Sequence, residues 1–342
     1  MKFKTFILLL IVLVALMILF SVSIGPVSLS LDECLDLFKS RLGFTGLDIN
    51  KIHEVVLYDI RLPRVLGGAI IGAALSIAGA AMQGLFKNPL ADPGLIGISS
   101  GASLSASLII VLGVNMGVFQ LFGISFWTFV GASLTTLLVF SLSQQNKETS
   151  VATMLLAGIA INAICGSVTG LLTYVSDDEE LRSITFWLMG SLAGIGWSQV
   201  WVMLIFILPS ILLLIRKGKS LNAFMLGDAD AKYMGVDTKK VKLIIVIATT
   251  LCVGTAVANS GMIGFVGLVI PHICRMMVGS DNRRVLPLSA LLGALLIISS
   301  DLLCRTVLAP AELPIGVVTS IVGSPIFLSI LIKEKRKKRF AL

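Results

Sequence analysis

The sequence is poor in charge. Lys, Arg, Asp and Glu together make up 13 % of its 342 residues, whereas a soluble domain carries about 25 %. Hydrophobic residues make up 56 % and the mean hydropathy is +0.99, so too little polar surface remains to coat a globule in water. This composition excludes a disordered chain and an ordinary water-soluble enzyme, and it predicts an integral membrane protein with many spans.

Catalytic and metal-binding motifs are also missing. The chain has only two histidines, His53 and His272, so the sequence offers no multi-histidine metal site. Gly218-Lys219-Ser220 resembles the end of a nucleotide-binding P-loop, but Leu213 stands where that motif requires glycine. We therefore expect no enzymatic activity, no metal and no cofactor in this chain, and any ATP and Mg²⁺ would be bound by a separate subunit.

The cysteines do not indicate a disulfide framework. There are five of them, an odd number, and none is spaced as CxxC. Four lie inside apolar runs, so we expect them to be small packing residues.

Long apolar runs recur along the whole chain, and a transmembrane helix needs about 20 such residues. Two of the runs are long enough for two helices each, and turn signals divide them around Asn115 and at Asn259-Ser260-Gly261. The predicted fold is therefore all-α, a single domain over residues 1–342 with ten spans. The spans lie near 5–24, 65–86, 94–113, 119–142, 151–174, 195–215, 243–258, 262–278, 285–304 and 313–332.

Basic residues divide unevenly between the two sides of this ten-span arrangement. Twenty of the 27 lie on the side that holds both termini. The positive-inside rule then places both termini in the cytoplasm. A nine-span or eleven-span arrangement would scramble this asymmetry.

Two of the predicted cytoplasmic segments have unusual compositions. Lys87-Asn88-Pro89-Leu90-Ala91-Asp92-Pro93-Gly94 contains two prolines and a glycine, which predict a rigid turn. An ordinary turn between helices is the alternative. The longer segment, 216–242, holds apolar residues suited to one face of short helices, and such a face needs a partner surface. A loop that lies on lipid headgroups is the alternative here.

On the outer side, residues 25–60 form the largest loop, and three arginines lie near the outer ends of their spans. Arg61, Arg64 and Arg305 suit either snorkelling anchors or a docking ring for an acidic soluble partner. Asp301 and Arg305 are four residues apart and should pair on one helix face.

Several motifs occur in a fixed order over residues 55–330. They are Arg61-Leu-Pro-Arg64, Gly72–Gln83, Asn88–Gly94, Phe186–Ser191, Gly261–His272 followed by Arg275, and Glu312–Gly316. These motifs, including Pro271, His272 and Arg275, resemble the FecCD-type permeases, which are the membrane subunits of binding-protein-dependent ABC importers. One departure is Met234, where the family usually carries leucine.

The resemblance implies a function and a set of partners. The chain would translocate an iron complex, either haem or a ferric siderophore, by alternating access driven by a separate ATPase. It would form a homodimer that binds two cytoplasmic ATPases and one extracytoplasmic binding protein, and no nucleic acid. Vitamin B12 is the alternative cargo. An ion-coupled secondary transporter is disfavoured, because the spans contain few ionisable residues.

The resemblance also implies roles for individual residues. Arg61, Arg64 and Arg305 would meet the binding protein, and Asn88, Pro89 and Leu90 would lie at the cytoplasmic gate. Spans 5 and 10 would line the path, with Asn162, Ser167, Thr169 and Thr173 as candidates; ordinary interhelical hydrogen bonds are the alternative for these four. The ATPase would couple through Leu226, Gly227, Asp228, Ala231, Met234, Gly235 and Val236.

Overall fold

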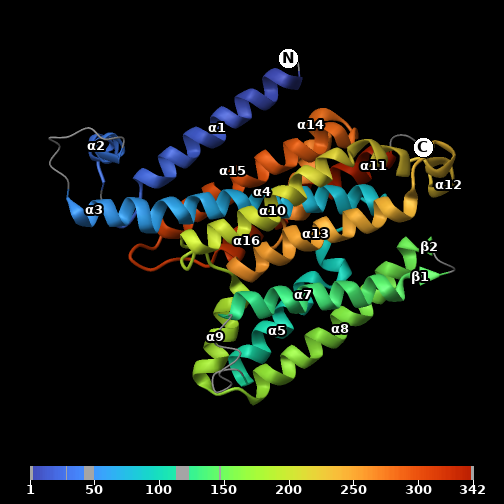
Figure 1. Ribbon diagram of the computed structural model, residues 1–342, viewed down its shortest axis with the longest axis horizontal. Coiled ribbons are helices and arrows are strands. Elements are labelled where there is room, and N and C mark those ends of the chain that lie inside the picture. Colours follow the sequence, from blue (N-terminus) through green and yellow to red (C-terminus); the bar gives the residue numbers. More distant parts are fainter. Residues whose placement is uncertain (1–2, 28, 42–49, 113–122, 146–147, 340–342) are drawn as a thin grey trace.

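The computed structural model describes residues 3–27, 29–41, 50–112, 123–145 and 148–339. Nearly all of this chain is helical (Figure 1). The first part holds α1 (Phe3–Ser23), α2 (Leu31–Arg41), α3 (Lys51–Val55), η1 (Val56–Arg61), α4 (Leu62–Phe86), η2 (Pro93–Ile96) and α5 (Ile98–Leu112). The middle holds α7 (Gly123–Leu142), the two-residue strands β1 (Gln144–Gln145) and β2 (Glu148–Thr149), α8 (Val151–Val175) and α9 (Asp178–Met189). The last part holds α10 (Trp197–Arg216), α11 (Gly218–Phe224), α12 (Asp228–Tyr233), α13 (Thr238–Ser260), α14 (Val266–Val278), α15 (Asn282–Thr306) and α16 (Ile315–Arg339).

The apolar helices follow the predicted ranges. Within the described residues, seven helices are long and apolar enough to cross a membrane, and α5, α14 and the Ile315–Ser329 part of α16 are shorter apolar helices. One of these helices falls in each predicted range, and α13 ends at Ser260, where a turn was expected. The turn expected around Asn115 lies outside the described residues. The short helices expected in segment 216–242 are present as α11 and α12.

Two groups of helices make up the molecule. The larger surrounds α4, which packs against α1, α10, α13, α14 and α15; the smaller consists of α5, α7 and α8, and it packs on α13 through α5 and α7 (Figure 1). The helices α11 and α12 lie with the β1–β2 hairpin at one end of the molecule, and α2 and α3 lie at the opposite end (Figure 1). The five cysteines are all free and buried, as expected.

Glycines allow α4 to pack closely against its neighbours. A Cβ atom placed on Gly72 would lie 2.2 Å from the carbonyl oxygen of Gly293 in α15, and one on Gly79 would lie 1.9 Å from that of Gly267 in α14. Helix backbones can approach this closely only where no side chain intervenes. The centre of the bundle therefore depends on the absence of side chains at these positions.

This packing predicts that Gly72→Ala destabilises the protein by about 1–3 kcal/mol, because an added methyl group would force α4 and α15 apart. Gly166→Ala in α8 is the matched control, since a Cβ atom there meets no atom of the chain within 4 Å. Thermal unfolding in detergent measures both. An unchanged midpoint for Gly72→Ala would contradict the packing.

Candidate functional site

The helices α11 and α12 form a knuckle, residues 218–236, outside the long apolar helices. Gly227 (φ 133°) precedes α12 and Gly235 (φ 80°) follows it, so both bends use backbone conformations that favour glycine. Leu226 and Met234 are 65 % and 63 % exposed, whereas Ala231 is buried. The Val236 N–H donates to the carbonyl of Ala231 at 3.0 Å and closes the second bend.

The first half of the knuckle is fixed to the start of α15. Asn222 Nδ2 donates to Asp281 Oδ1 at 2.6 Å, and the Asn282 N–H donates to Asn222 Oδ1 at 2.8 Å. The Arg283 side chain, which hydrogen-bonds to Asp281, is the main reason that the pKa of this carboxyl lies well below its usual range. Because Leu221 and Phe224 are also fully buried, α11 is held by both packing and hydrogen bonds.

The second half is held through Asp228, the first residue of α12. Its Oδ1 lies 3.3 Å from Lys87 Nζ and its Oδ2 lies 2.6 Å from Lys242 Nζ. Lys242 Nζ also donates to the Thr149 carbonyl at 2.8 Å. Burial alone would raise the pKa of Asp228, but the hydrogen bond and charge of Lys242, with a smaller contribution from Lys87, lower it. The ionised carboxylate is therefore the stable form of this residue.

The predicted gate residues form a compact turn directly after α4. Lys87 ends α4 in a left-handed conformation (φ 53°), and the Asn88 N–H donates to the Gln83 carbonyl at 3.2 Å. The Asn88 side chain in turn accepts the Leu90 N–H at 2.9 Å. The rigid turn expected from the prolines is present, and Asn88 adds the side-chain cap that fixes it.

One cavity brings the gate turn, the 271–275 motif and the knuckle together. Its volume is about 320 Å³, which lies at the lower end of the range of ligand pockets, about 300–1,000 Å³. Arg275 donates to the Ala80 carbonyl at 3.3 Å and to Asn282 Oδ1 at 3.2 Å, and Pro271 is buried inside α14. The lining residues are Gln83, Lys87, Asn88, Pro89, Met225, His272, Arg275, Met276 and Ser280.

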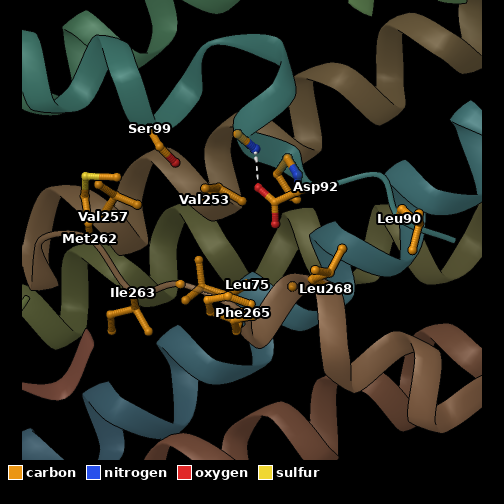
Figure 2. A pocket seen from close by; sticks show the side chains of 14 residues that line it. Leu75, Leu90, Asp92, Ser99, Val253, Val257, Met262, Ile263, Phe265 and Leu268 are labelled. Atoms are coloured by element: carbon orange, nitrogen blue, oxygen red, sulfur yellow. Dashed lines mark hydrogen bonds between the residues drawn. The ribbon is translucent and has the colours of Figure 1, made fainter. Parts of the chain in front are cut away.

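A second cavity of ≈ 390 Å³ lies behind the gate turn, between α4, α13 and the start of α14 (Figure 2). Asp92 borders it and accepts the Gly94 N–H at 2.7 Å. Desolvation raises the pKa of the Asp92 carboxyl, although this hydrogen bond opposes the change. Leu75, Phe265 and Leu268 make the opposite wall apolar (Figure 2).

The four path candidates in α8 do not share one face. Asn162 turns inward, where its side chain accepts from Ser100 Oγ and its Nδ2 donates to the Gly94 carbonyl at 3.1 Å. Thr169 is buried, and Thr173 donates to the Thr169 carbonyl at 2.8 Å. Ser167 alone of the four is exposed. Asn162 therefore holds α8 against the end of the gate segment.

The three outer arginines are buried, with 4 % exposure for Arg61, 7 % for Arg64 and 2 % for Arg305. Arg61 donates to the carbonyls of Val22 and Ser23 at the end of α1, at 3.1 and 2.9 Å. Arg305 donates to the Ser21 and Ile24 carbonyls at 2.6 and 2.7 Å. These guanidinium groups satisfy the carbonyls that a helix C-terminus leaves unpaired.

The third arginine links two acidic residues. Arg64 makes a bidentate contact with Glu312 at 2.8 and 2.9 Å and reaches Asp301 at 2.8 Å. Asp301 also accepts from Arg305 at 3.1 Å, which confirms the predicted pair. All three guanidinium groups are therefore buried against acceptors of the chain itself, as cations at this depth require. Their docking to a binding protein stays a prediction.

Sequence reasoning missed four residues that hold the knuckle: Thr149, Asn222, Lys242 and Asp281. Lys242 gave no signal, because its partner Asp228 is 14 residues away and no helical spacing relates them. Asp281 could have been found from its position as a helix N-cap in front of a long apolar run. Asn222, 59 residues from Asp281, gave no such indication.

Comparison with known proteins places this geometry in a family. The model of the FecCD transport family matches residues 11–333. The chain belongs to the FecCD transport family. It is 45 % identical to the hemin transport system permease protein HmuU of Yersinia pestis, over 82 % of this chain and 84 % of that protein.

Other relatives extend this result. The vitamin B12 import system permease protein BtuC of Vibrio cholerae is 41 % identical over 83 % of this chain and 85 % of its own length. A solved structure, described as an inward-facing conformation of a metal-chelate type ABC transporter, matches with a TM-score of 0.85 and 31 % identity. That match covers 96 % of this chain and 99 % of the other.

The outer contacts predict that Arg305→Gln lowers the free energy of unfolding by about 3 kcal/mol, because Asp301 and the end of α1 lose a buried cation. Arg182→Gln is the matched control, since Arg182 is exposed on α9 and its loss should cost less than about 0.5 kcal/mol. Thermal unfolding in detergent compares the two. If Arg305→Gln unfolds like the parent protein, the internal role of Arg305 is wrong.

Proposed function

We propose that this chain is the permease subunit of a binding-protein-dependent ABC importer in the inner (cytoplasmic) membrane. In this proposal the ten apolar helices each cross the bilayer, both termini are cytoplasmic, and the chain itself hydrolyses no ATP. The knuckle and gate turn then face the cytoplasm, and Arg61, Arg64 and Arg305 lie near the outer surface.

The observation that carries the proposal is the apolar surface of the knuckle. Met225, Leu226, Tyr233 and Met234 are 46 %, 65 %, 90 % and 63 % exposed, and their segment lies beyond the apolar helices. Exposing large apolar side chains to water is unfavourable, so a cluster of them on short helices outside the membrane indicates a surface that another protein covers. A cytoplasmic ATPase subunit that docks on the knuckle explains this exposure.

A second copy of the chain would complete the path. The α8 side chains Leu156, Ile159 and Leu171 are 68 %, 58 % and 61 % exposed, and Ile321 in α16 is 67 % exposed. We propose that α8 and α16 of two copies face each other, with Ser167 and the glycines near it along the path. ATP binding to two docked ATPases would then favour one of the two alternating-access conformations of the dimer, and hydrolysis would reverse that preference.

An extracytoplasmic binding protein would deliver the cargo to the outer end. For its acidic residues to reach Arg64, they would have to displace Glu312, which is 34 % exposed. Arg64 holds the pKa of the Glu312 carboxyl below its ordinary value, so this pair is ionised and an incoming carboxylate competes directly with it. Contact with the buried Arg61 and Arg305 would require the end of α1 to move.

For the cargo, we propose an iron complex, either haem or a ferric siderophore. The relative named for hemin is 45 % identical to this chain, and vitamin B12 is the alternative because the relative named for it is 41 % identical. Both cargos are wide, which suits a path between two subunits.

The docking proposal predicts that Leu226→Asp combined with Met234→Asp abolishes co-purification of the ATPase, because two charges would be buried in an apolar contact. Val307→Asp is the matched control, since Val307 is 60 % exposed after α15 at the opposite end. Quantitative pull-down from membranes measures both. Unchanged ATPase recovery with the double variant would contradict docking on the knuckle.

The cargo proposal predicts that the binding protein encoded beside this chain binds hemin or a ferric hydroxamate more tightly than cyanocobalamin by at least about tenfold, which corresponds to about 1.4 kcal/mol. Calorimetric titration with the three ligands measures this preference. Tighter binding of cyanocobalamin would contradict the iron-complex proposal and would favour vitamin B12 as the cargo.

A further inference from the structure

The knuckle is connected to the rest of the chain in two different ways. Hydrogen bonds from Asn222 hold α11 to the start of α15, whereas α12 has glycine at both ends, Gly227 and Gly235. These glycines give the six-residue helix α12 backbone freedom at both of its bends. Side-chain contacts, of which that of the buried Ala231 is one, therefore decide which movements of α12 reach other helices.

Asp228 is placed to carry such a movement. Its Oδ1 lies 3.3 Å from Nζ of Lys87, the residue that caps the C-terminus of α4, and the gate residues follow Lys87 directly in the chain. The other oxygen contacts Lys242, whose Nζ is bonded to the Thr149 carbonyl, two residues before α8 begins. One carboxylate thus joins α12 to the gate turn on one side and, through Lys242 of α13, to the end of β2 directly before α8 on the other.

The two ion pairs of Asp228 differ in burial, because the Lys87 side chain is 35 % exposed whereas the Lys242 side chain is buried. The Lys242 side chain is 6 % exposed and that of Asp228 is 43 % exposed. A buried ammonium group loses much of its hydration and holds its counter-charge tightly. At the gate, the Asn88 side chain fixes the turn by accepting the Leu90 N–H, and Asn162 holds α8 to the other end of the same segment at Gly94.

We propose that Asp228 is the positioning residue through which movement of α12 is transmitted to the gate turn and to α8. This inference rests on the proposed function, because it takes a docked ATPase as the source of the movement. Without the carboxylate, the ATPase would still bind the apolar side chains of the knuckle, but α12 would turn about its glycines and leave the gate in place.

The test measures the gate directly and needs no cargo. Leu90→Cys places a thiol on the gate turn, where Leu90 is 43 % exposed, and the five native cysteines are buried. The rate of labelling by a membrane-impermeant maleimide is measured in nanodiscs with the ATPase bound, with and without ATP plus vanadate. In the Leu90→Cys protein the two rates should differ. Adding Asp228→Asn should bring their ratio to about 1, because nucleotide then no longer favours either gate conformation.

Three further variants separate transmission from folding and from docking. Asp228→Glu keeps the carboxylate and should restore the rate difference, and Lys87→Gln should lose it as Asp228→Asn does. Asp230→Asn removes the same charge from an exposed position on α12 and should leave the difference intact. ATPase co-purification should be equal in all of them.

A nucleotide-dependent rate in Asp228→Asn equal to that of the parent would overturn the inference, and so would loss of ATPase binding in this variant, which would make Asp228 a docking residue. Failure of the proposed function is recognisable separately, because the Leu90→Cys protein itself would then bind no ATPase.

Discussion

The close packing of α4 is the constraint on which the rest of the structure depends. Gly72 and Gly79 bring its backbone against those of α15 and α14, so these three helices form one closely packed unit. Charged residues lie at both ends of α4: Arg61 and Arg64 at its start and Lys87 directly after its last residue. In lipid such charges need partners within the protein, and at both ends distant segments supply them.

These two ends have different surroundings and different consequences. At the outer end, Arg64 and Arg305 share Asp301 and hold α1, α15 and the approach to α16 together. At the other end, Lys87 meets the half-exposed carboxylate of Asp228 on α12, a helix that has glycine at both ends. The outer network favours a fixed structure, whereas the inner contact favours a movable one.

Much of the fold was predictable from local sequence features. Apolar length located the apolar helices of the described chain, and the composition of segment 216–242 predicted the short helices of the knuckle. The pair of Asp301 and Arg305 followed from a spacing of four residues within one helix. What could not be predicted depends on contacts between remote segments. Arg64 reaches Asp301 and Glu312 across 237 and 248 residues, so its inward orientation left no local sign.

The same limit applied to the candidate site. The gate turn and the knuckle were recognisable by their prolines, glycines and apolar residues, and the 271–275 motif by resemblance. Their meeting around one cavity is a property of the tertiary structure. For Asn162 the sequence left two roles open, because a polar residue in an apolar helix suits both a path lining and an interhelical hydrogen bond. In the structure its side chain holds α8 to the Gly94 carbonyl.

Uptake by reconstituted proteoliposomes is the most direct test that a separate ATPase drives this chain. The purified permease, its ATPase and its binding protein should together accumulate radiolabelled hemin or ferric hydroxamate when ATP is supplied on the ATPase side, and omission of any one component should abolish accumulation. Accumulation by the permease alone, driven only by a proton or sodium gradient, would contradict an ATP-driven importer.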